Sequence, residues 1–166
     1  MTPRNIRELI YLLYGRYVRG LEGDDLDSFV RLPIQWQRMI REDEIVFGQA
    51  KNCVYCGRTD GIKPWPVIPP QRAGADQRLL HILRSKDNQV PTCEECICIM
   101  GERDVFEWHP RLEDIPAEAM FAFLKTAYQI HQTQGTLEST DPNMDGRLDL
   151  RDLAVALLYF ALRREP

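Results

Sequence analysis

The sequence predicts an α+β protein, with helical segments on both sides of a short β-rich centre. Apolar residues recur at helical spacing near the N-terminus and again over residues 116–132. Between these stretches, short β-like pieces alternate with prolines, and two Cys-x-x-Cys pairs flank them. We therefore expect three segments: an N-terminal helical segment over 1–47, a central metal-bound module with its following helix over 48–134, and a C-terminal loop and helix over 135–166.

Composition limits the classes of protein to which the chain can belong. The 166 residues suit one domain, or a compact domain with an appendage, and an apolar fraction of 44% is enough for a true core. No apolar run approaches bilayer length, and the N-terminal residues MTPRNIREL are not typical of a signal peptide. The cytoplasm is therefore the expected location. A net charge of −4 argues against indiscriminate binding of nucleic acid, although it allows a local basic face.

The N-terminal segment predicts two helices. The first follows Thr2-Pro3, which suit a cap and a first helical turn. Its apolar residues at helical spacing are Ile6, Leu9, Ile10, Leu13, Tyr14 and Tyr17. Residues 23–29, GDDLDSF, indicate a turn and a second helix. The inward-facing candidates of the second helix are Leu26, Phe29, Val30, Trp36 and Ile40.

The centre reads as short β-like pieces, followed by helices. EIVF at 44–47 and CVYCG at 53–57 have β character, and the proline-rich residues 62–74 can hold only an edge strand or a loop. Residues 77–85, QRLLHILRS, fit either a short helix or a strand. A helix can begin at the second cysteine pair, where its dipole favours thiolates. Residues 116–132 form an amphipathic helix with a proline at its start.

The two cysteine pairs predict a zinc site. Cys53 and Cys56 form the first pair, and Cys93 and Cys96 form the second. Four thiolates in two close pairs suit tetrahedral zinc, at about 2.3 Å from each sulfur. The alternatives are two unrelated pairs of buried cysteines, or two disulfides. The fifth cysteine, Cys98, is interpreted as a small buried residue or a bystander rather than a ligand, because four thiolates already complete the ion's coordination.

Residues 53–108 carry a family resemblance. CVYCG is followed by VIPPQRAG at 67–74, by DNQVPTCEEC at 87–96 and by GERDVFEW at 101–108. These pieces, in this order, resemble the zinc-bearing subset of HNH endonucleases, which have two Cys-x-x-Cys pairs. The resemblance implies a β-hairpin followed by a helix (a ββα, treble-clef-like module) whose base is tied together by zinc.

The sequence departs from that family at its catalytic positions. The resemblance aligns the family's general-base histidine with Pro66, and the aspartate that helps to hold a catalytic Mg²⁺ with Trp65. Proline has no titratable group and cannot act as a base. The polar residues expected after the second cysteine pair are Ile97 and Met100. Asn88 remains, at a position that the family uses to orient the catalytic element. These departures predict an inactive module.

An active enzyme is the rival interpretation. His81 lies seven residues before Asn88 and is the candidate for a relocated base in a metal-dependent endonuclease acting on DNA phosphodiesters. A packed or surface histidine is the alternative interpretation of His81. His109 reads as a loop residue, and His131 as a residue near a helix end, where a cation is favourable.

The C-terminal segment predicts a calcium loop. Residues 141–152, DPNMDGRLDLRD, place oxygen donors at loop positions one, three, five, seven and twelve, with Gly146 at the sharp turn. The predicted ligands are Asp141, Asn143, Asp145, Arg147 through its carbonyl, and Asp152. With the helix that follows, the loop resembles one repeat of a dockerin, a family of EF-hand-like modules that also uses Asp at position twelve. The alternative is an acidic turn that caps the last helix.

These observations predict an HNH-like module that is stabilised by zinc, lacks nuclease activity, and binds nucleic acid or a nucleic-acid-associated protein. The nucleic-acid part follows from the resemblance. Candidate contacts are Lys63, Arg72, Arg84 and Lys86, each of which fits a solvated surface charge equally well. The remaining alternatives are the active endonuclease and a structural or protein-interaction module with a calcium-stabilised tail.

Overall fold

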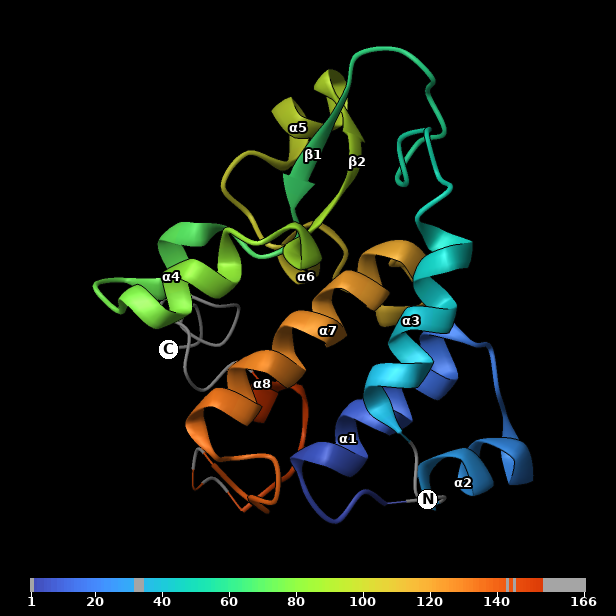
Figure 1. The fold of residues 1–166 in the computed structure, drawn as a ribbon, viewed down its shortest axis with the longest axis vertical. Helices are drawn as coiled ribbons and strands as arrows, with labels where there is room; N and C mark the ends of the chain where they lie inside the picture. The colour runs from blue at the N-terminus through green and yellow to red at the C-terminus, as the bar shows by residue number, and fades with distance from the viewer. Residues whose placement is uncertain (1, 32–34, 143, 145, 154–166) are drawn as a thin grey trace.

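A computed structural model describes residues 2–31, 35–142, 144 and 146–153 of the chain. The protein is α+β, with helices around one two-stranded sheet in the part described. The sheet and helix α5 (Glu94–Met100) lie at one end, and the N-terminal helices lie at the other (Figure 1). The long helix α7 (Ala117–Gln134) runs between them.

The N-terminal helices begin later than the sequence suggested. Helix α1 (Ile6–Leu13) is capped by Asn5, whose side chain accepts the Glu8 backbone N–H, so Thr2-Pro3 is not the cap. Helix α1 continues into a π-helical turn, η1 (Tyr14–Val18). Helix α2 (Gly23–Arg31) follows, as predicted, and buries Leu26 and Val30. Trp36 and Ile40, which were assigned to this second helix, lie instead on a separate helix over Trp36–Phe47.

The β interpretation of residues 44–47 is wrong, because they form the last turn of helix α3 (Trp36–Phe47). A strand would send alternate side chains to one face, whereas here two adjacent residues, Ile45 and Val46, are 68% and 67% exposed. Phe47 turns back instead and packs on Phe121, with the ring centroids 4.9 Å apart. The second β-like piece, residues 53–57, is a turn closed by the Gly57 N–H bond to the Cys53 carbonyl at 2.9 Å.

The sheet pairs strand β1 (Ile62–Pro66) with strand β2 (Gln89–Cys93) in antiparallel register. Pro64 lies opposite Pro91, and neither residue has an N–H to exchange. Since hydrogen-bonded and non-hydrogen-bonded pairs alternate, Lys63–Thr92 and Trp65–Val90 are the pairs that carry the ladder. The strand prolines therefore occupy the positions where they cost no ladder bond, as the edge-strand prediction requires.

Short helices fill the space between and after the strands. The 3₁₀ turn η2 (Pro70–Ala73) leads to helix α4 (Gln77–Leu83), and the turn η3 (Lys86–Asn88) leads into β2. Residues 77–83 are therefore a helix rather than a strand, because the Asp76 carboxylate caps the backbone N–H groups of Arg78 and Leu79. Helix α6 (Val105–Trp108) and the turn η4 (Leu112–Asp114) connect α5 to α7.

Helix α7 organises the main core. It follows Pro116, as predicted, and ends at Gly135, whose φ of +73° lies in the left-handed region. Its residues Phe123, Leu124 and Ile130 are fully buried. Helix α3 packs against α7 through stacked rings, with Trp36 4.3 Å from Tyr128 between centroids, and Tyr11 of α1 stacks on the same Trp36.

The C-terminal segment packs on the same core. The backbone N–H groups of Ile6 and Arg7 donate to the carbonyls of Ser139 and Leu137. Helix α8 (Leu150–Leu153) buries Leu153, whose carbonyl lies 3.0 Å from Nε2 of His131. No helix among the described residues is both long enough and apolar enough to cross a bilayer.

Candidate metal centre

The four paired cysteines come together at the sheet end of the molecule. The sulfurs of Cys53, Cys56, Cys93 and Cys96 all lie within 4.8 Å of one another. Cys56 Sγ and Cys93 Sγ are 3.5 Å apart, far beyond the roughly 2.05 Å of a disulfide, and all four thiols are free. Tetrahedral zinc with bonds of about 2.3 Å would separate its sulfurs by about 3.8 Å. The cluster therefore has the composition and size of a metal site.

Local structure places each pair. Two backbone hydrogen bonds close the turn at 53–57. The Cys53 N–H donates to the Arg58 carbonyl, and the Gly57 N–H donates to the Cys53 carbonyl, both at 2.9 Å. Gly57 has a φ of +80°, which favours glycine at this point of the turn. Cys93 is the N-cap of α5, and its sulfur accepts the Cys96 N–H at 3.4 Å. The helix begins at the second pair, as the sequence predicted.

The thiols differ in acidity. Burial alone would raise the pKa of the Cys53 thiol, but backbone hydrogen bonds from Cys93, Cys56 and Tyr55 lower that pKa to about 6. Burial and the neighbouring thiols raise the pKa of Cys96. One sulfur is thus prepared as a thiolate, whereas a bound cation would be needed to deprotonate the whole set.

The surroundings protect three of the four sulfurs. Cys53, Cys93 and Cys96 are buried, and Cys56 is exposed. Tyr55, Ile62 and Trp108 pack against the buried three. Ion pairs from Arg58 to Glu95 and from Lys63 to Glu94 lie around the first turn of α5. Cys98 is exposed and outside the cluster, so the buried interpretation is wrong, whereas its place outside the predicted ligand set agrees with a bystander.

The positions that the resemblance assigns to catalysis contain no acid–base group. Trp65 and Pro66 end strand β1, Ile97 is half-buried on α5, and Met100 is buried. Asn88 is fully buried and joins two loops: its amide nitrogen donates to the carbonyls of Ile68 and Leu83, each at 2.8 Å. Its Oδ1 accepts the Ile68 N–H at 3.2 Å.

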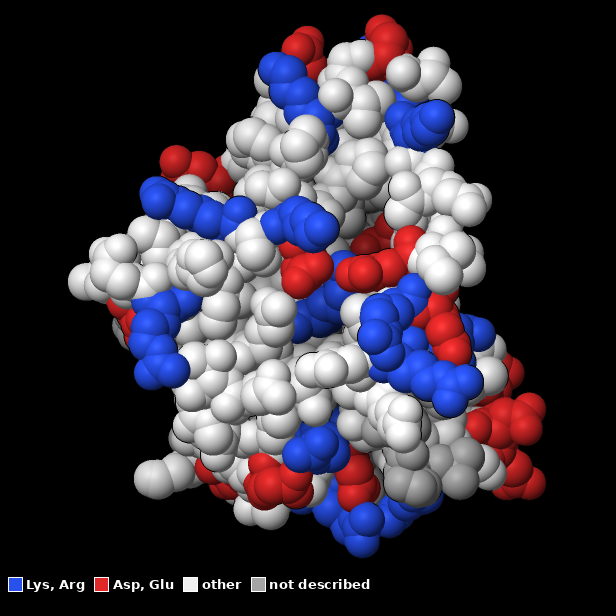
Figure 2. Space-filling view, in the orientation of Figure 1, with Lys and Arg blue, Asp and Glu red and all other residues white. Residues whose placement is uncertain are grey.

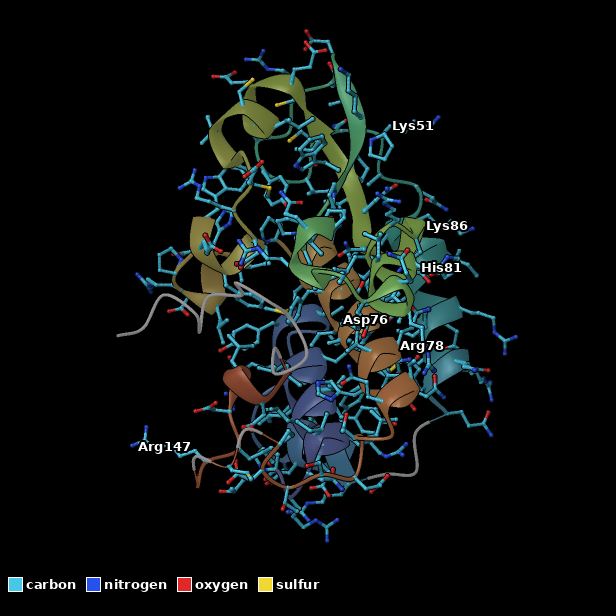
Figure 3. The ribbon with its side chains drawn as sticks, turned by 90° about the vertical axis from the view of Figure 1, so that its left-hand side faces the viewer. Lys51, Asp76, Arg78, His81, Lys86 and Arg147 are labelled. Atoms are coloured by element: carbon cyan, nitrogen blue, oxygen red, sulfur yellow. The ribbon has the colours of Figure 1, made fainter. Side chains whose placement is uncertain are left out.

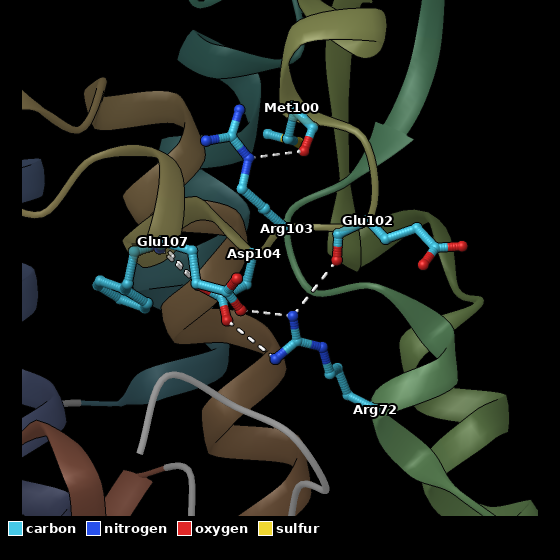
Figure 4. A network of polar contacts seen from close by, with 7 residues as sticks. Arg72, Met100, Glu102, Arg103, Asp104 and Glu107 are labelled. Atoms are coloured by element: carbon cyan, nitrogen blue, oxygen red, sulfur yellow. Dashed lines mark hydrogen bonds and ion pairs between the residues drawn. The ribbon is translucent and has the colours of Figure 1, made fainter. Parts of the chain in front are cut away.

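Arg72 was a candidate for contact with nucleic acid, and the structure corrects this prediction. Its side chain is 5% exposed and pairs with Asp104 and Glu107, whose side chains are 0% and 4% exposed (Figure 4). Burial and the neighbouring Glu107 raise the pKa of Asp104 to about 6, against the opposing effect of Arg72. Sequence inspection missed this network, because its partners lie more than 30 positions from Arg72.

His81 lies on the exposed side of helix α4 (Figure 3). Among the described residues, it belongs to no group of three or more side chains that could hold a metal ion. The other histidines are packed. His109 stacks on Tyr55, with the ring centroids 5.7 Å apart. His131 is buried, and its Nδ1 lies 2.6 Å from the Thr136 hydroxyl.

The predicted calcium loop is described only in part. Asn143 and Asp145 lie outside the described residues. Gly146 has a φ of +80°, and its N–H donates to Asp141 Oδ2 at 2.8 Å. The Asp152 carboxylate is buried and accepts the Asp149 N–H at 2.8 Å, so Asp152 also caps helix α8. Leu148, within this loop, packs against the main core.

Two surface depressions lie between α3 and α7. The first, of about 390 Å³, has walls from α3, β2 and α7. The second, of about 300 Å³, adjoins it at Asp87 and Lys125. Lys125 is paired with Glu44 and Asp87, and Figure 2 shows acidic and basic side chains together around this hollow. The ion pairs in these walls thus centre on Lys125, and Lys86 also lines the first depression.

Comparison with known proteins gives no match to any family model, curated protein or solved structure.

Proposed function

We propose that Cys53, Cys56, Cys93 and Cys96 bind one structural Zn²⁺ ion that ties β1, β2 and α5 together. The single observation that carries this proposal is the convergence of the four free thiols within 4.8 Å. Thiolates select soft and borderline cations, and four of them leave zinc no open position for catalysis. The proposal includes a reducing compartment such as the cytoplasm, where thiols stay available to the metal.

A pair of serine variants tests the zinc site. Cys93→Ser removes a buried ligand, whereas Cys98→Ser changes an exposed cysteine outside the cluster. Metal analysis of the purified proteins should find one zinc per chain in the wild type and in Cys98→Ser, and much less in Cys93→Ser. Equal zinc content in all three proteins would contradict the assigned ligand set.

We further propose that the module is HNH-like, is inactive as a nuclease, and binds nucleic acid. The resemblance over residues 53–108 supports the first part, together with the order of a hairpin followed by a helix. The second part rests on Pro66, which cannot accept a proton at the position of the family's base. A nucleic-acid-associated protein is the alternative partner, and a short DNA duplex is the first ligand to test.

A nicking assay separates this proposal from the rival endonuclease. Supercoiled plasmid incubated with the protein and Mg²⁺ or Mn²⁺ should remain intact. Cleavage by the wild type that is lost in His81→Ala would establish His81 as a relocated base and defeat the inactive assignment. Cleavage that persists in His81→Ala would indicate a contaminating nuclease or a different base.

A calcium-binding tail is the second candidate function. It rests on the spacing of residues 141–152 and on the Gly146 N–H bond to the Asp141 carboxylate across the sharp turn. Calorimetric titration with Ca²⁺ should show one site that Asp141→Asn weakens by at least an order of magnitude. A titration without heat would leave the loop as an acidic cap of α8, with a structural role alone.

A further inference from the structure

We infer that the exposed side of α4 and η3 binds the phosphate backbone of nucleic acid. This basic strip consists of Arg78, His81, Arg84 and Lys86, all of them exposed. The inference rests on the proposed nucleic-acid function and assigns it a surface. Arg84 and Lys86 were expected from the sequence, whereas Arg78 and His81 join them only through the helical geometry.

The strip differs from the other basic surfaces in its ion pairs. Elsewhere among the described residues, most exposed cations form ion pairs, for example Arg38 with Glu42, Arg58 with Glu95, and Arg111 with Glu113. Arg16, Arg41 and Lys51 are also exposed and outside the ion pairs of the described residues, but they lie on three separate segments: η1, α3 and the loop after α3. In the part of the chain that the structure describes, no carboxylate lies within ion-pair distance of Arg78, Arg84 or Lys86. In a protein with a net charge of −4, these three cations have no ion-pair partner among the described residues.

The two carboxylates nearest in sequence are directed elsewhere. The Asp76 carboxylate accepts the backbone N–H groups at the start of α4. The Asp87 carboxylate lies 3.5 Å from Lys125 Nζ and 3.3 Å from the Gln129 amide nitrogen, both on α7. Lys63 on β1 was also a candidate for contact with nucleic acid, but its side chain is paired with Glu94. Positive charge is therefore concentrated on the outer side of α4 and η3.

Helical geometry aligns the strip. Leu79, Ile82 and Leu83 are buried, so the residues at 78, 81 and 84 fall on the other side of the helix at three-residue steps. Six residues of helix rise about 9 Å, which matches two to three phosphates of one strand at about 3.4 Å each. Figure 3 shows Arg78, His81 and Lys86 near one another on the face turned to the viewer.

The support beneath the strip is rigid. The Asp76 cap holds the start of α4, and the Asn88 side chain donates to the Leu83 carbonyl at its end. Cations on an ordered helix lose less conformational freedom on binding than cations on a loose chain. Guanidinium groups also bind phosphate in a bidentate manner, which favours a phosphate backbone over scattered carboxylates.

Matched triple variants test the inference. The strip variant carries Arg78→Gln, Arg84→Gln and Lys86→Gln; the control carries Arg38→Gln, Arg58→Gln and Arg111→Gln. Both lose three exposed positive charges, so their net charges are equal. Binding of a short DNA duplex, followed by fluorescence anisotropy over a range of salt concentrations, is the readout. The slope of log K against log salt should fall by about 2–3 in the strip variant and by less than about 1 in the control.

The outcomes separate the inference from the function on which it rests. If the wild type does not bind DNA at low salt, the proposed function fails. If it binds, and the strip variant matches the wild type or the two triple variants lose affinity equally, the inference alone is overturned. If poly-glutamate binds through the same residues as tightly as DNA, the partner is an acidic protein, and the nucleic-acid assignment is wrong. Thermal melting confirms that each variant is folded.

Discussion

Asn88 shows how one polar side chain can hold two segments of the chain together. Its three hydrogen bonds join the segment after β1 to the end of α4, and all three lie in the protein interior. Removing the amide leaves one buried N–H and two buried carbonyls without this partner, at a cost of about 1–3 kcal/mol for each unsatisfied group.

We therefore expect Asn88→Ala to lower the free energy of unfolding by at least about 3 kcal/mol. Ser85→Ala is the matched control, because the Ser85 hydroxyl is buried and makes no hydrogen bond among the described residues. Urea denaturation of both variants provides the measurement. Equal stability of the two variants would show that the Asn88 bonds contribute little to folding.

Asp104 predicts a dependence of stability on pH. Its pKa is raised to about 6 in the folded protein from 3.8, so the folded state binds a proton more tightly than the unfolded state. This contribution to stability is complete below pH 4 and is lost as the pH rises to about 6, a change on the order of 2–3 kcal/mol.

Asp104→Asn isolates this contribution. Asparagine can still cap α6 through its side-chain oxygen, which now accepts the Phe106 and Glu107 N–H groups, but it does not titrate. The difference in unfolding free energy between the wild type and the variant should therefore change between pH 4 and 6 and stay flat above. Burial lowers the pKa of His131, so below the ordinary histidine pKa this residue makes stability rise with pH. The wild type and the variant share this contribution, which therefore cancels in the difference between their unfolding free energies. A difference that is constant with pH would refute the raised pKa of Asp104.

At the residue scale, the sequence predicted the cysteine cluster but not the buried charges. The two-residue spacers bring each pair of sulfurs together locally, so Cys53 with Cys56, and Cys93 with Cys96, could be predicted. The Arg72 network depends instead on the approach of η2 to α6, which no local pattern encodes. Arg72 could therefore only be read as a surface charge.

At the element scale, the register of the sheet gives a sharp test. Lys63 lies opposite Thr92 in a pair that carries ladder bonds, and its side chain makes only a surface ion pair. Lys63→Pro removes the N–H and fixes φ near −65°, so we expect it to destabilise the sheet by about 2–3 kcal/mol and to weaken zinc retention. The control Lys63→Ala removes the same ion pair, keeps the N–H, and should cost less than about 1 kcal/mol. Chelator competition and thermal melting measure both effects, and equal losses in the two variants would contradict the register.

The helices were predicted where apolar residues recur at helical spacing, although the cap of α1 is Asn5 and not the predicted Thr2-Pro3. Helices α1, α2 and α7 carry apolar residues at helical spacing, and α5 starts at a cysteine that caps it. Residues 44–47 were misread because their β-branched residues suggest a strand, whereas the preceding turns of α3 carry the helix on to Phe47. For α4, the local sequence fitted either a helix or a strand. In the structure it is a helix, and its residues Leu79, Ile82 and Leu83 pack on the core.

At the scale of the whole molecule, the cysteine cluster and the apolar core form separate buried groups. Cys53, Cys93 and Cys96 cluster with Tyr55, Ile62 and Trp108, whereas one continuous core extends over the helices α1, α2, α3, α4, α6 and α7 and reaches Val90 of β2. Tyr55 packs against both groups. Zinc binding can contribute about 10 kcal/mol or more to the folding of a small metal module. The sheet end should therefore depend on the metal far more than the helical end.

We expect removal of zinc by a chelator to release the sheet end while the helical end stays folded. Hydrogen exchange should accelerate over residues 53–66 and 89–101 and remain slow in α1 and α7. Adding zinc back should restore protection in both segments. Uniform loss of protection along the chain would show that the molecule unfolds as one cooperative unit.

The strand prolines have a consequence beyond this fold. In β1, the backbone groups at 62, 64 and 66 point away from β2, and two of these three residues are prolines. In β2, the outward carbonyl of Pro91 already accepts the Val54 N–H at 3.0 Å. An incoming strand would find few N–H donors along β1 and an occupied carbonyl at Pro91 of β2. Both edges of this two-stranded sheet are therefore poor templates for intermolecular β-pairing, which protects the sheet from fibril growth.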